Sequence, residues 1–331
     1  MANLDLPVTM TTASLRVRNP LALPVTRLSP PVLLMARLVI LALFLRGYAI
    51  AAMPARRVPF FAWCETIGSA HDWKLALVSL FVTGAFLVFF NRLPRIGCLL
   101  AGSALIFGTL INSANYANSR LFPGCLLVLT ALQDGGAPAR LALRGQIFVL
   151  YLGASLSKLF EPDWWTGQYF EFWLREKLNI AWYARLADAL PPMALSTFMG
   201  VTTIIMEAVI CVSLLRRSWW PMAFVTAILF HVGGFLICGL DFGVFLYVSL
   251  LSFLVFAPDD LFPRLAGLRI APGWRSVASR PWTWMLLLFV LISAGQVWPL
   301  GQRILAFAYA LFMVRVVLVY VRQARVSQGS E

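Results

Sequence analysis

Charged residues are scarce in this sequence, and several site types are missing altogether. Only 12% of the 331 residues are charged, and the two histidines have no ligand spacing with the five cysteines. A metal site is therefore not expected. The sequence contains no C-x-x-C pair, no P-loop and no G-x-G-x-x-G, so neither thiol–disulfide chemistry nor a bound nucleotide is predicted.

Apolar residues make up the bulk of the chain. They account for 60% of it, and the mean hydropathy is +0.81. Such a chain cannot bury its apolar surface in one aqueous globule, so we predict an all-α polytopic membrane protein whose main partner is membrane lipid. The net charge of +13 does not indicate nucleic acid, because the arginines fall between apolar segments rather than along one basic face.

About ten segments are long and apolar enough to be predicted as spanning helices, although three are short and the total could be eight or nine. In chain order these segments are Pro31–Met53, Trp73–Asn91, Ile96–Ala114, Leu121–Gln133, Gln146–Phe160, Met193–Leu215, Trp219–Gly239, Gly243–Ala257, Trp282–Trp298 and Arg303–Val321. Together they form a single predicted membrane domain over residues 31–321.

Arginines gather in every alternate loop between these segments, which predicts the cytoplasmic side and places both termini there. Residues 1–30 are predicted to be a disordered basic cytoplasmic arm, and residues 322–331 a short cytoplasmic tail. Residues 161–191 mix many aromatic side chains with charges, which is typical of an amphipathic helix lying at the outer membrane surface.

Lys158 is the most informative residue, because it lies at the far end of an apolar segment and the chain has only three lysines against 24 arginines. A desolvated lysine can lose its proton near neutral pH, which an arginine cannot do. Ionisable groups within a membrane are functional candidates by default. Lys158 is thus a candidate base.

Other polar residues are predicted to share a cavity with Lys158. Tyr151 and Ser155 precede it on one helix face. Lys158, Glu207 and His231 lie at comparable depth, roughly 21, 13 and 18 Å from the cytoplasmic edge at about 1.5 Å per residue. A carboxylate beside Lys158 would keep the amine charged, whereas burial alone would favour the neutral amine, and the sequence leaves this open.

Each of these residues also has a purely structural interpretation. Lys158 could extend to the outer interface beside Trp164. Glu207 could form a structural ion pair with an arginine such as Arg46. His231 could be a hydrogen-bonded packing residue.

The stretch from Tyr151 to Gly167 resembles the membrane region shared by vitamin K-dependent gamma-carboxylases and the bacterial HTTM (horizontally transferred transmembrane) family. The residues that carry the resemblance are Tyr151, Ala154, Lys158, Leu159, Asp163, Trp164 and Gly167. This sequence departs from the pattern at Ser155, where the family has glycine, and in a link before Trp164 that is one residue longer. The block F-H-V-G-G-F around His231 resembles the family's histidine-bearing helix, and Glu207 and Arg37 resemble its acidic residue and first-span arginine.

The resemblance implies a quinol-linked enzyme of the bacterial inner membrane, with an oxidase-like or carboxylase-like (lyase) activity. Lys158 would be the base that deprotonates a vitamin K-like quinol, His231 would orient the quinol, and Glu207 would set the protonation state of the amine. Tyr151, Ser155 and Trp164 would bind the quinol. A non-enzymatic alternative stays open, in which the protein belongs to a peptide or toxin export or immunity system and binds a peptide at its exterior face. A third alternative, a small-solute carrier, also stays open.

Overall fold

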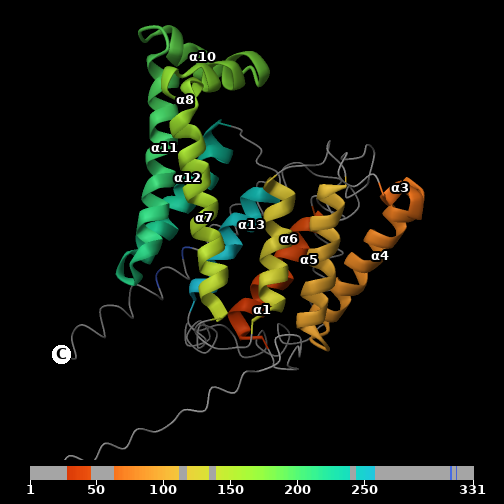
Figure 1. The fold of residues 1–331 in the computed structure, drawn as a ribbon. Helices are drawn as coiled ribbons and strands as arrows, with labels where there is room; N and C mark the ends of the chain where they lie inside the picture. Colours follow the sequence, from red (N-terminus) through yellow and green to blue (C-terminus); the bar gives the residue numbers. More distant parts are fainter. Residues whose placement is uncertain are drawn as a thin grey trace, which may run out of the picture.

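The structure is a computed structural model that describes residues 28–45, 63–111, 118–133, 139–238 and 244–257, with Val314 and Leu318 as isolated positions. Every regular element in these ranges is helical, which confirms the all-α fold class (Figure 1). The predicted ninth and tenth spans, the C-terminal tail and the basic arm up to residue 27 lie outside the described residues, as does Arg46.

Eight helices correspond to the first eight predicted spans. Their bounds are α1 (Pro30–Leu45), α4 (Ala70–Phe89), α5 (Pro94–Leu110), α6 (Asn118–Ala131), α7 (Ala139–Phe160), α11 (Ala194–Leu215), α12 (Trp220–Cys238) and α13 (Val244–Ser252). A one-turn helix, α3 (Cys64–Ile67), precedes α4, and the 3₁₀ turns η4 (Arg217–Trp219) and η5 (Phe253–Phe256) lie before α12 and after α13. The largest difference is in α7, which begins seven residues before the predicted Gln146.

Apolar composition makes several of these helices candidates to cross a bilayer. In the part of the chain that the structure describes, three helical segments are long and apolar enough: Ala70–Phe89, Ala194–Leu215 and Arg217–Phe235. Four shorter apolar helices accompany them, at Pro30–Phe44, Pro94–Leu110, Ser119–Ala131 and Val244–Phe256. These helices support a membrane protein, whereas the total of eight to ten spans stays a prediction.

Local sequence signals set several helix starts. Ser69 caps α4, where its hydroxyl accepts from the backbone N–H of Asp72 and the Asp72 carboxylate accepts from the backbone N–H of Ser69. This reciprocal capping box satisfies two N–H groups that have no partner within the helix. Pro94 stands in the first turn of α5, where its missing N–H costs nothing.

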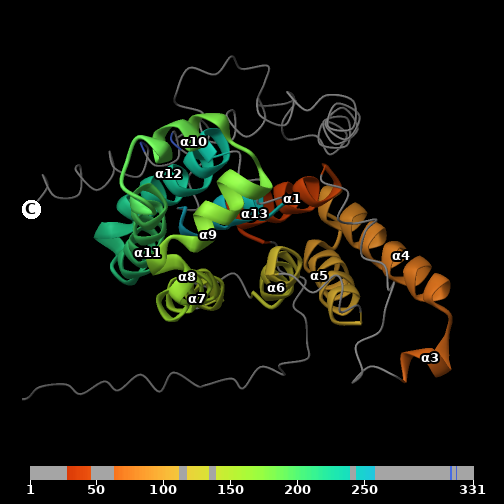
Figure 2. The ribbon, with the colours of Figure 1, turned by 90° about the horizontal axis from the view of Figure 1, so that it is seen from above.

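The helices α4, α5 and α6 form a tightly packed group on one side of the molecule (Figure 2). Glycines face each other at both helix contacts. A Cβ at Gly84 would lie 2.5 Å from the carbonyl oxygen of Gly97, and a Cβ at Gly102 would lie 2.7 Å from that of Gly124. Such small-residue contacts let backbones approach closely, which is how membrane helices gain packing energy in the absence of water.

Arginines close the ends of several helices at the lower end of Figure 1. The Arg95 side chain donates to the carbonyl oxygen of Ala131 at the end of α6, and Arg140 donates to that of Ala257 after η5. Arg37 donates to the last carbonyl of α4, Phe89, and to its neighbour Val88. C-terminal carbonyls have no partner within their helix and carry a partial negative charge, so a cation stabilises them.

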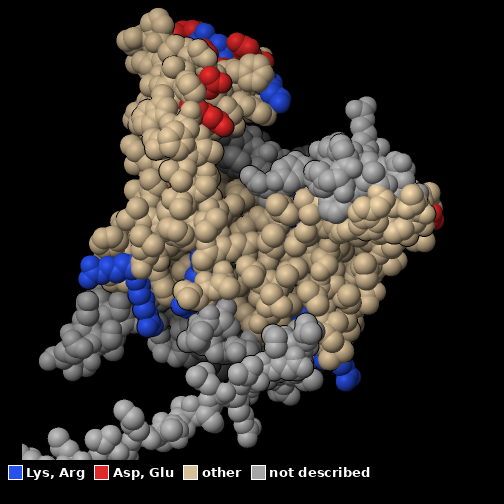
Figure 3. All heavy atoms as spheres, viewed as in Figure 1, with Lys and Arg blue, Asp and Glu red and all other residues tan. Residues whose placement is uncertain are grey.

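Outside the cap, basic residues gather mainly at the lower end of the described helices, whereas the cap carries basic and acidic residues together (Figure 3). The helix ends that carry Arg92, Arg95, Arg140 and Arg144 lie there, as does the end of α11, which Arg216 and Arg217 follow (Figure 1). This grouping agrees with the predicted alternation of arginine-rich loops.

The opposite end carries a helical cap built from residues 162–188. It consists of α8 (Pro162–Thr166), α9 (Gln168–Phe170), a π-helical segment η3 (Glu171–Lys177) and α10 (Ala181–Asp188). The prediction of one amphipathic helix here is wrong in detail, because the chain turns at Gly167 and Asn179, whose φ angles are 81° and 48°. The positive φ at Gly167 is readily adopted only by glycine.

Candidate functional site

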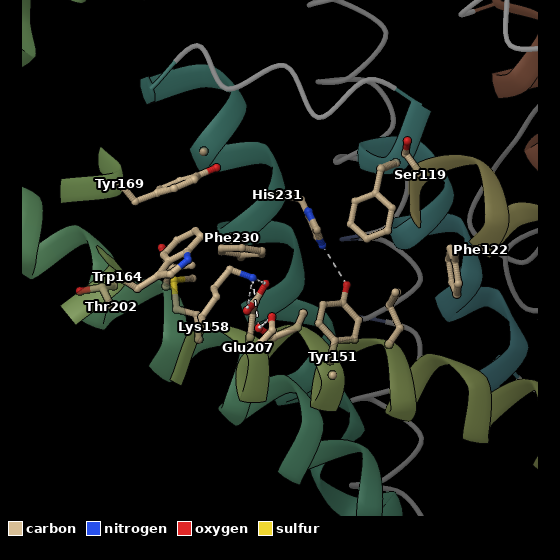
Figure 4. Close-up of a pocket in the computed structure, with 18 of the residues that line it drawn as sticks. Ser119, Phe122, Tyr151, Lys158, Trp164, Tyr169, Thr202, Glu207, Phe230 and His231 are labelled. Atoms are coloured by element: carbon tan, nitrogen blue, oxygen red, sulfur yellow. Dashed lines mark hydrogen bonds and ion pairs between the residues drawn. The ribbon is translucent and has the colours of Figure 1, made fainter. Parts of the chain in front are cut away.

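A cavity of about 970 Å³ lies between α6, α7, α11, α12 and α13, with α8 and α9 also contributing to its wall (Figure 4). Most of its lining is apolar or aromatic. The side chains that could form hydrogen bonds within it are Ser119, Gln146, Tyr151, Ser157, Lys158, Trp164, Tyr169, Thr202, Thr203, Glu207 and His231. An apolar cavity with a few converging polar groups is the usual form of a small-molecule site.

Lys158 and Glu207 form an ion pair in the wall of this cavity. The ammonium nitrogen of Lys158 lies 2.8 Å from Oε2 and 3.0 Å from Oε1 of Glu207, and the two side chains are 16% and 5% exposed. The amine thus points across to α11 rather than out to the membrane surface, unlike in the structural interpretation of this lysine. It also donates to the carbonyl oxygen of Ala154 at 3.3 Å and lies 4.9 Å from the centre of the Trp164 ring.

Tyr151 and His231 form a second polar pair. The Tyr151 hydroxyl lies 2.9 Å from Nε2 of His231, and both residues are almost fully buried. The rings of Phe230 and Phe245 lie edge-on to the imidazole, with centroids 4.8 and 5.8 Å away. Burial among these rings gives the pair a surrounding of low dielectric constant, where a hydrogen bond is strong and costly to break.

Helix α7 brings the two pairs to one place. Tyr151 and Lys158 are seven residues apart, which is two helical turns, so both side chains leave the same face of α7. Their partners come from different helices, Glu207 from α11 and His231 from α12. All four side chains line one cavity (Figure 4).

Aromatic side chains of the cap form the upper wall. The Trp164 and Tyr169 rings stack at 4.0 Å with an interplanar angle of 20°, and Phe170 meets both rings edge-on. The cap is seated on α11 at Gly200, where a Cβ would collide with the carbonyl oxygen of Trp164. The ring that covers the Lys158 amine is therefore fixed by backbone packing.

An ion-pair network holds the outer part of the cap together. Arg175 lies 2.9 Å from Glu171 and 2.6 Å from Asp188, and the Tyr183 hydroxyl donates to Glu171 at 2.6 Å. The hydrogen bond to Asp188 raises the pKa of Arg175. Burial, and then the hydrogen bond to Glu171, raise the pKa of Tyr183 to about 12.

The predicted site residues fall into two groups. Lys158, Glu207, His231, Tyr151 and Trp164 all line the cavity. Ser155 is buried but is not part of the lining, because the cavity-facing arc of α7 runs through residues 146, 149, 150, 151, 153, 154, 157 and 158.

Sequence analysis missed several cavity residues. Gln146 was taken only as a span boundary, and Tyr169 only as one interfacial aromatic among many. Phe230 and Cys125 carried no signal that separated them from other residues of apolar helices. For Gln146 and Gly153 a signal does exist, because both share the face of α7 that carries Lys158.

Metal ligands do not converge in the described ranges, where no group of three or more His, Cys, Asp or Glu side chains could hold an ion. Among the described residues that line the cavity, Lys158 and Glu207 are the only ones with charged side chains. An ammonium paired with a carboxylate, beside a tyrosine paired with a histidine, can accept and pass on protons.

Comparison with known families agrees with this arrangement. Residues 137–261 match the HTTM domain family. The match covers more than a third of the chain and extends from the start of α7 past the end of η5, so every residue of the two polar pairs lies within the HTTM match. Searches among curated proteins and among solved structures gave no significant match. The resemblance to the HTTM family is confirmed over residues 137–261, and this match together with the apolar helices supports a membrane protein.

Proposed function

We propose that the protein is a quinol-linked enzyme of the cell membrane, in which the Lys158–Glu207 pair takes up a proton from a quinol bound in the cavity. The observation that carries this proposal is a single one: an ammonium and a carboxylate 2.8 Å apart line a large apolar cavity among membrane helices. Charged groups at such a depth are costly and usually have a function.

The cavity suits an aromatic ring with polar substituents. Its volume of about 970 Å³ lies at the upper end of the range for small-molecule sites. Phe230 offers a flat apolar face between the two polar pairs (Figure 4). A ring with two hydroxyl groups could place one beside Lys158 and the other beside the Tyr151–His231 pair.

Proton uptake by the pair needs no group from outside. The Lys158 ammonium passes a proton to Glu207 along their hydrogen bond, which leaves a neutral amine facing the cavity. The amine then accepts the proton of the ligand hydroxyl. At the end Glu207 is protonated, Lys158 is an ammonium again, and its charge stabilises the new oxyanion in a site shielded from water.

A bound quinol would supply two electrons to molecular oxygen, the acceptor of an oxidase-like reaction, because its deprotonated form is oxidised far more readily than the neutral form. The described side chains would supply the rest. Tyr151 and His231 would orient the ring, and Trp164 would shield the amine from the exterior solution. The activity would be oxidase-like or carboxylase-like.

Lys158→Arg tests the proposal, because arginine keeps the positive charge beside Glu207 but cannot give up its proton. We expect quinol oxidation by purified protein to fall by about 100-fold or more, which is the range of a lost general base. This variant should still bind a quinone that has no isoprenoid tail, as measured by the quenching of tryptophan fluorescence. Quinol oxidation at the wild-type rate in a folded Lys158→Arg variant would reject the proposed role.

Glu207→Gln is the matched variant on the partner helix. It leaves the size of the side chain unchanged and removes the group that stores the proton, so turnover should also fall. Thr202→Val is the control, because Thr202 lines the same cavity on α11 without contacting the ion pair. Its turnover should stay within about threefold of wild type, which is under 1 kcal/mol.

A second candidate function, peptide binding by a member of an export or immunity system, is favoured by the exposed aromatics of the cap. Trp165, Phe172 and Trp182 are 41%, 51% and 40% exposed and stand beside charged residues. Replacing all three with serine should abolish a peptide-sensitivity phenotype and spare quinol oxidation. An unchanged phenotype would reject this alternative.

We further propose that the basic end faces the cytoplasm and that the cap lies outside, because short cytoplasmic loops carry the excess of basic residues. Cysteines introduced at Ser218, in η4, and at exposed Glu176, in the cap, test this orientation. In intact cells an impermeant thiol reagent should label the Glu176→Cys protein and spare the Ser218→Cys protein. The reverse pattern would invert the topology.

A further inference from the structure

Helix α7 contains two glycines against which none of the described residues packs. A Cβ at Gly145 or Gly153 would meet no atom within 4 Å, whereas the glycines of α4, α5 and α6 lie against neighbouring backbones. Of these two, only Gly153 lines the cavity. A helical glycine is less stable than alanine by about 1 kcal/mol, and here helix packing gives nothing in return.

Gly153 belongs to a row of residues that are both exposed and part of the cavity wall. Val149, Gly153 and Ser157 follow each other at intervals of four residues, so they lie along one side of α7. Val149 is 62% exposed. The cavity therefore reaches the outside of the described helices along this side of α7.

The first residue of the neighbouring helix α6 lies below Gly153. The side chain of Gln146 donates to the carbonyl oxygen of Phe122, four residues after the start of α6, which fixes the relative height of the two helices. Because α6 and α7 run in opposite directions (Figure 1), Gly153 lies about 10 Å further up α7 than Gln146, beyond the first residue of α6. At the height of Gly153, α6 no longer covers the cavity.

Apolar side chains surround this opening. Leu156, Leu159 and Phe160 on the outer face of α7 are 41%, 42% and 79% exposed. Exposed apolar residues on a membrane helix contact lipid tails, so the opening leads into the bilayer and not into water.

We infer that the cavity is filled from the bilayer, through an opening between Gly153 and the first turn of α6, by a ring-bearing lipid with a long apolar tail. The ring would reach the Lys158–Glu207 pair, about one and a half helical turns above Gly153, and the tail would cross α7 at Gly153. This inference rests on the proposed function for the identity of the ring, while the opening itself rests on geometry.

Three glycine substitutions distinguish an effect on the opening from an effect on the cavity itself. Gly153→Trp blocks the opening, Gly145→Trp adds the same bulk to the same helix outside the cavity, and Gly233→Leu fills the cavity from α12, where a Cβ also meets nothing. The probes are a naphthoquinone with a long isoprenoid tail and the tailless naphthoquinone, each bound to protein in lipid nanodiscs and followed by tryptophan quenching.

We expect Gly153→Trp to weaken binding of the tailed quinone about tenfold and to change binding of the tailless one less than threefold. Gly233→Leu should weaken both, and Gly145→Trp neither. Gly153→Leu, which is smaller, should show the same pattern to a lesser degree. Equal affinities of wild type and Gly153→Trp for the tailed quinone would overturn the opening.

A second readout does not depend on quinone. Cys125 lines the cavity on α6 and is partly exposed. In protein whose only cysteine is Cys125, a maleimide with a long alkyl chain should react about tenfold faster than in the same protein carrying Gly153→Trp. The remaining cysteines to be replaced by alanine are Cys64, Cys98, Cys211 and Cys238.

The two readouts distinguish failure of the opening from failure of the proposed function. If Gly153→Trp slows labelling but neither quinone binds to wild type, the opening stands and the quinol is rejected. If both quinones bind and Gly153→Trp changes neither their affinity nor the labelling rate, the opening is rejected and the quinol stands.

Discussion

Glycine has opposite roles in the two sides of this molecule. In α4, α5 and α6 it removes side chains where backbones touch, with Gly84 against Gly97 and Gly102 against Gly124. In α7 and α12 it removes side chains where nothing touches, at Gly145, Gly153 and Gly233. The first group makes a rigid wall, and the second leaves room for another molecule.

Polar side chains divide in the same way. On the packed side, buried Thr109 and Thr130 donate to the backbone of their own helix, four residues back. Around the cavity, Lys158, Glu207, Tyr151 and His231 bond across helices instead. Polar groups that could have been satisfied within one helix are structural, whereas groups that join three helices around a space indicate a site.

Loss of one member of the ion pair should have the largest effect on stability. Lys158→Met leaves the Glu207 carboxylate buried without its partner, and we expect the free energy of unfolding to fall by about 3 kcal/mol. The double variant Lys158→Met/Glu207→Leu should recover most of this loss, because an apolar pair has no charge to desolvate. Equilibrium unfolding in mixed micelles measures both, and equal losses in the single and double variants would contradict a buried pair.

Gly84→Leu should be the next most damaging change. Its Cβ would lie 2.5 Å from one backbone atom and 2.7 Å from another, and neither can move without separating α4 from α5. We expect a loss of about 2 to 3 kcal/mol, as for an overpacked core. The matched change Gly153→Leu should leave the free energy of unfolding unchanged or raise it. Similar unfolding midpoints for the two variants would contradict the difference between packed and unpacked glycines.

Tyr151→Phe should have a smaller effect. It removes the hydroxyl that bonds His231 and leaves the ring contacts, so we expect a loss of about 1 kcal/mol in stability. Quinol affinity should fall more than turnover, because the pair orients the ring and does not take its proton. A Tyr151→Phe enzyme with unchanged KM would show that the pair does not contact the substrate.

The cap should show the smallest effect, and only at high pH. The folded cap holds the Tyr183 pKa at about 12, so unfolded chains lose this proton at lower pH than folded ones. The contribution of Tyr183 to stability is therefore complete below about pH 10 and is lost as the pH rises to about 12. Absorbance at 295 nm should show that Tyr183→Phe lacks a tyrosine that titrates near pH 12 in the wild type, and identical titrations would disprove this assignment.

Much of this arrangement could be predicted from the sequence, since apolar length alone located α4, α11 and α12 to within a few residues. The depth estimate also placed Lys158, Glu207 and His231 at one level, and they line one cavity. The Tyr151–His231 bond could not be predicted, because it depends on where α12 lies relative to α7. Ser155 was assigned to the site because spacing along one helix does not say where the cavity-facing arc ends.

The arginines at the basic end have a consequence for how this sequence can change. Arg37, Arg95 and Arg140 each donate to backbone carbonyls at or next to the last turn of another helix, so the charges that would orient the chain in the membrane also join its helices. Lysine would preserve the sign of the charge yet offer no planar array of donors. The same side chains thus serve both membrane insertion and helix assembly. The preference for arginine over lysine follows from helix assembly.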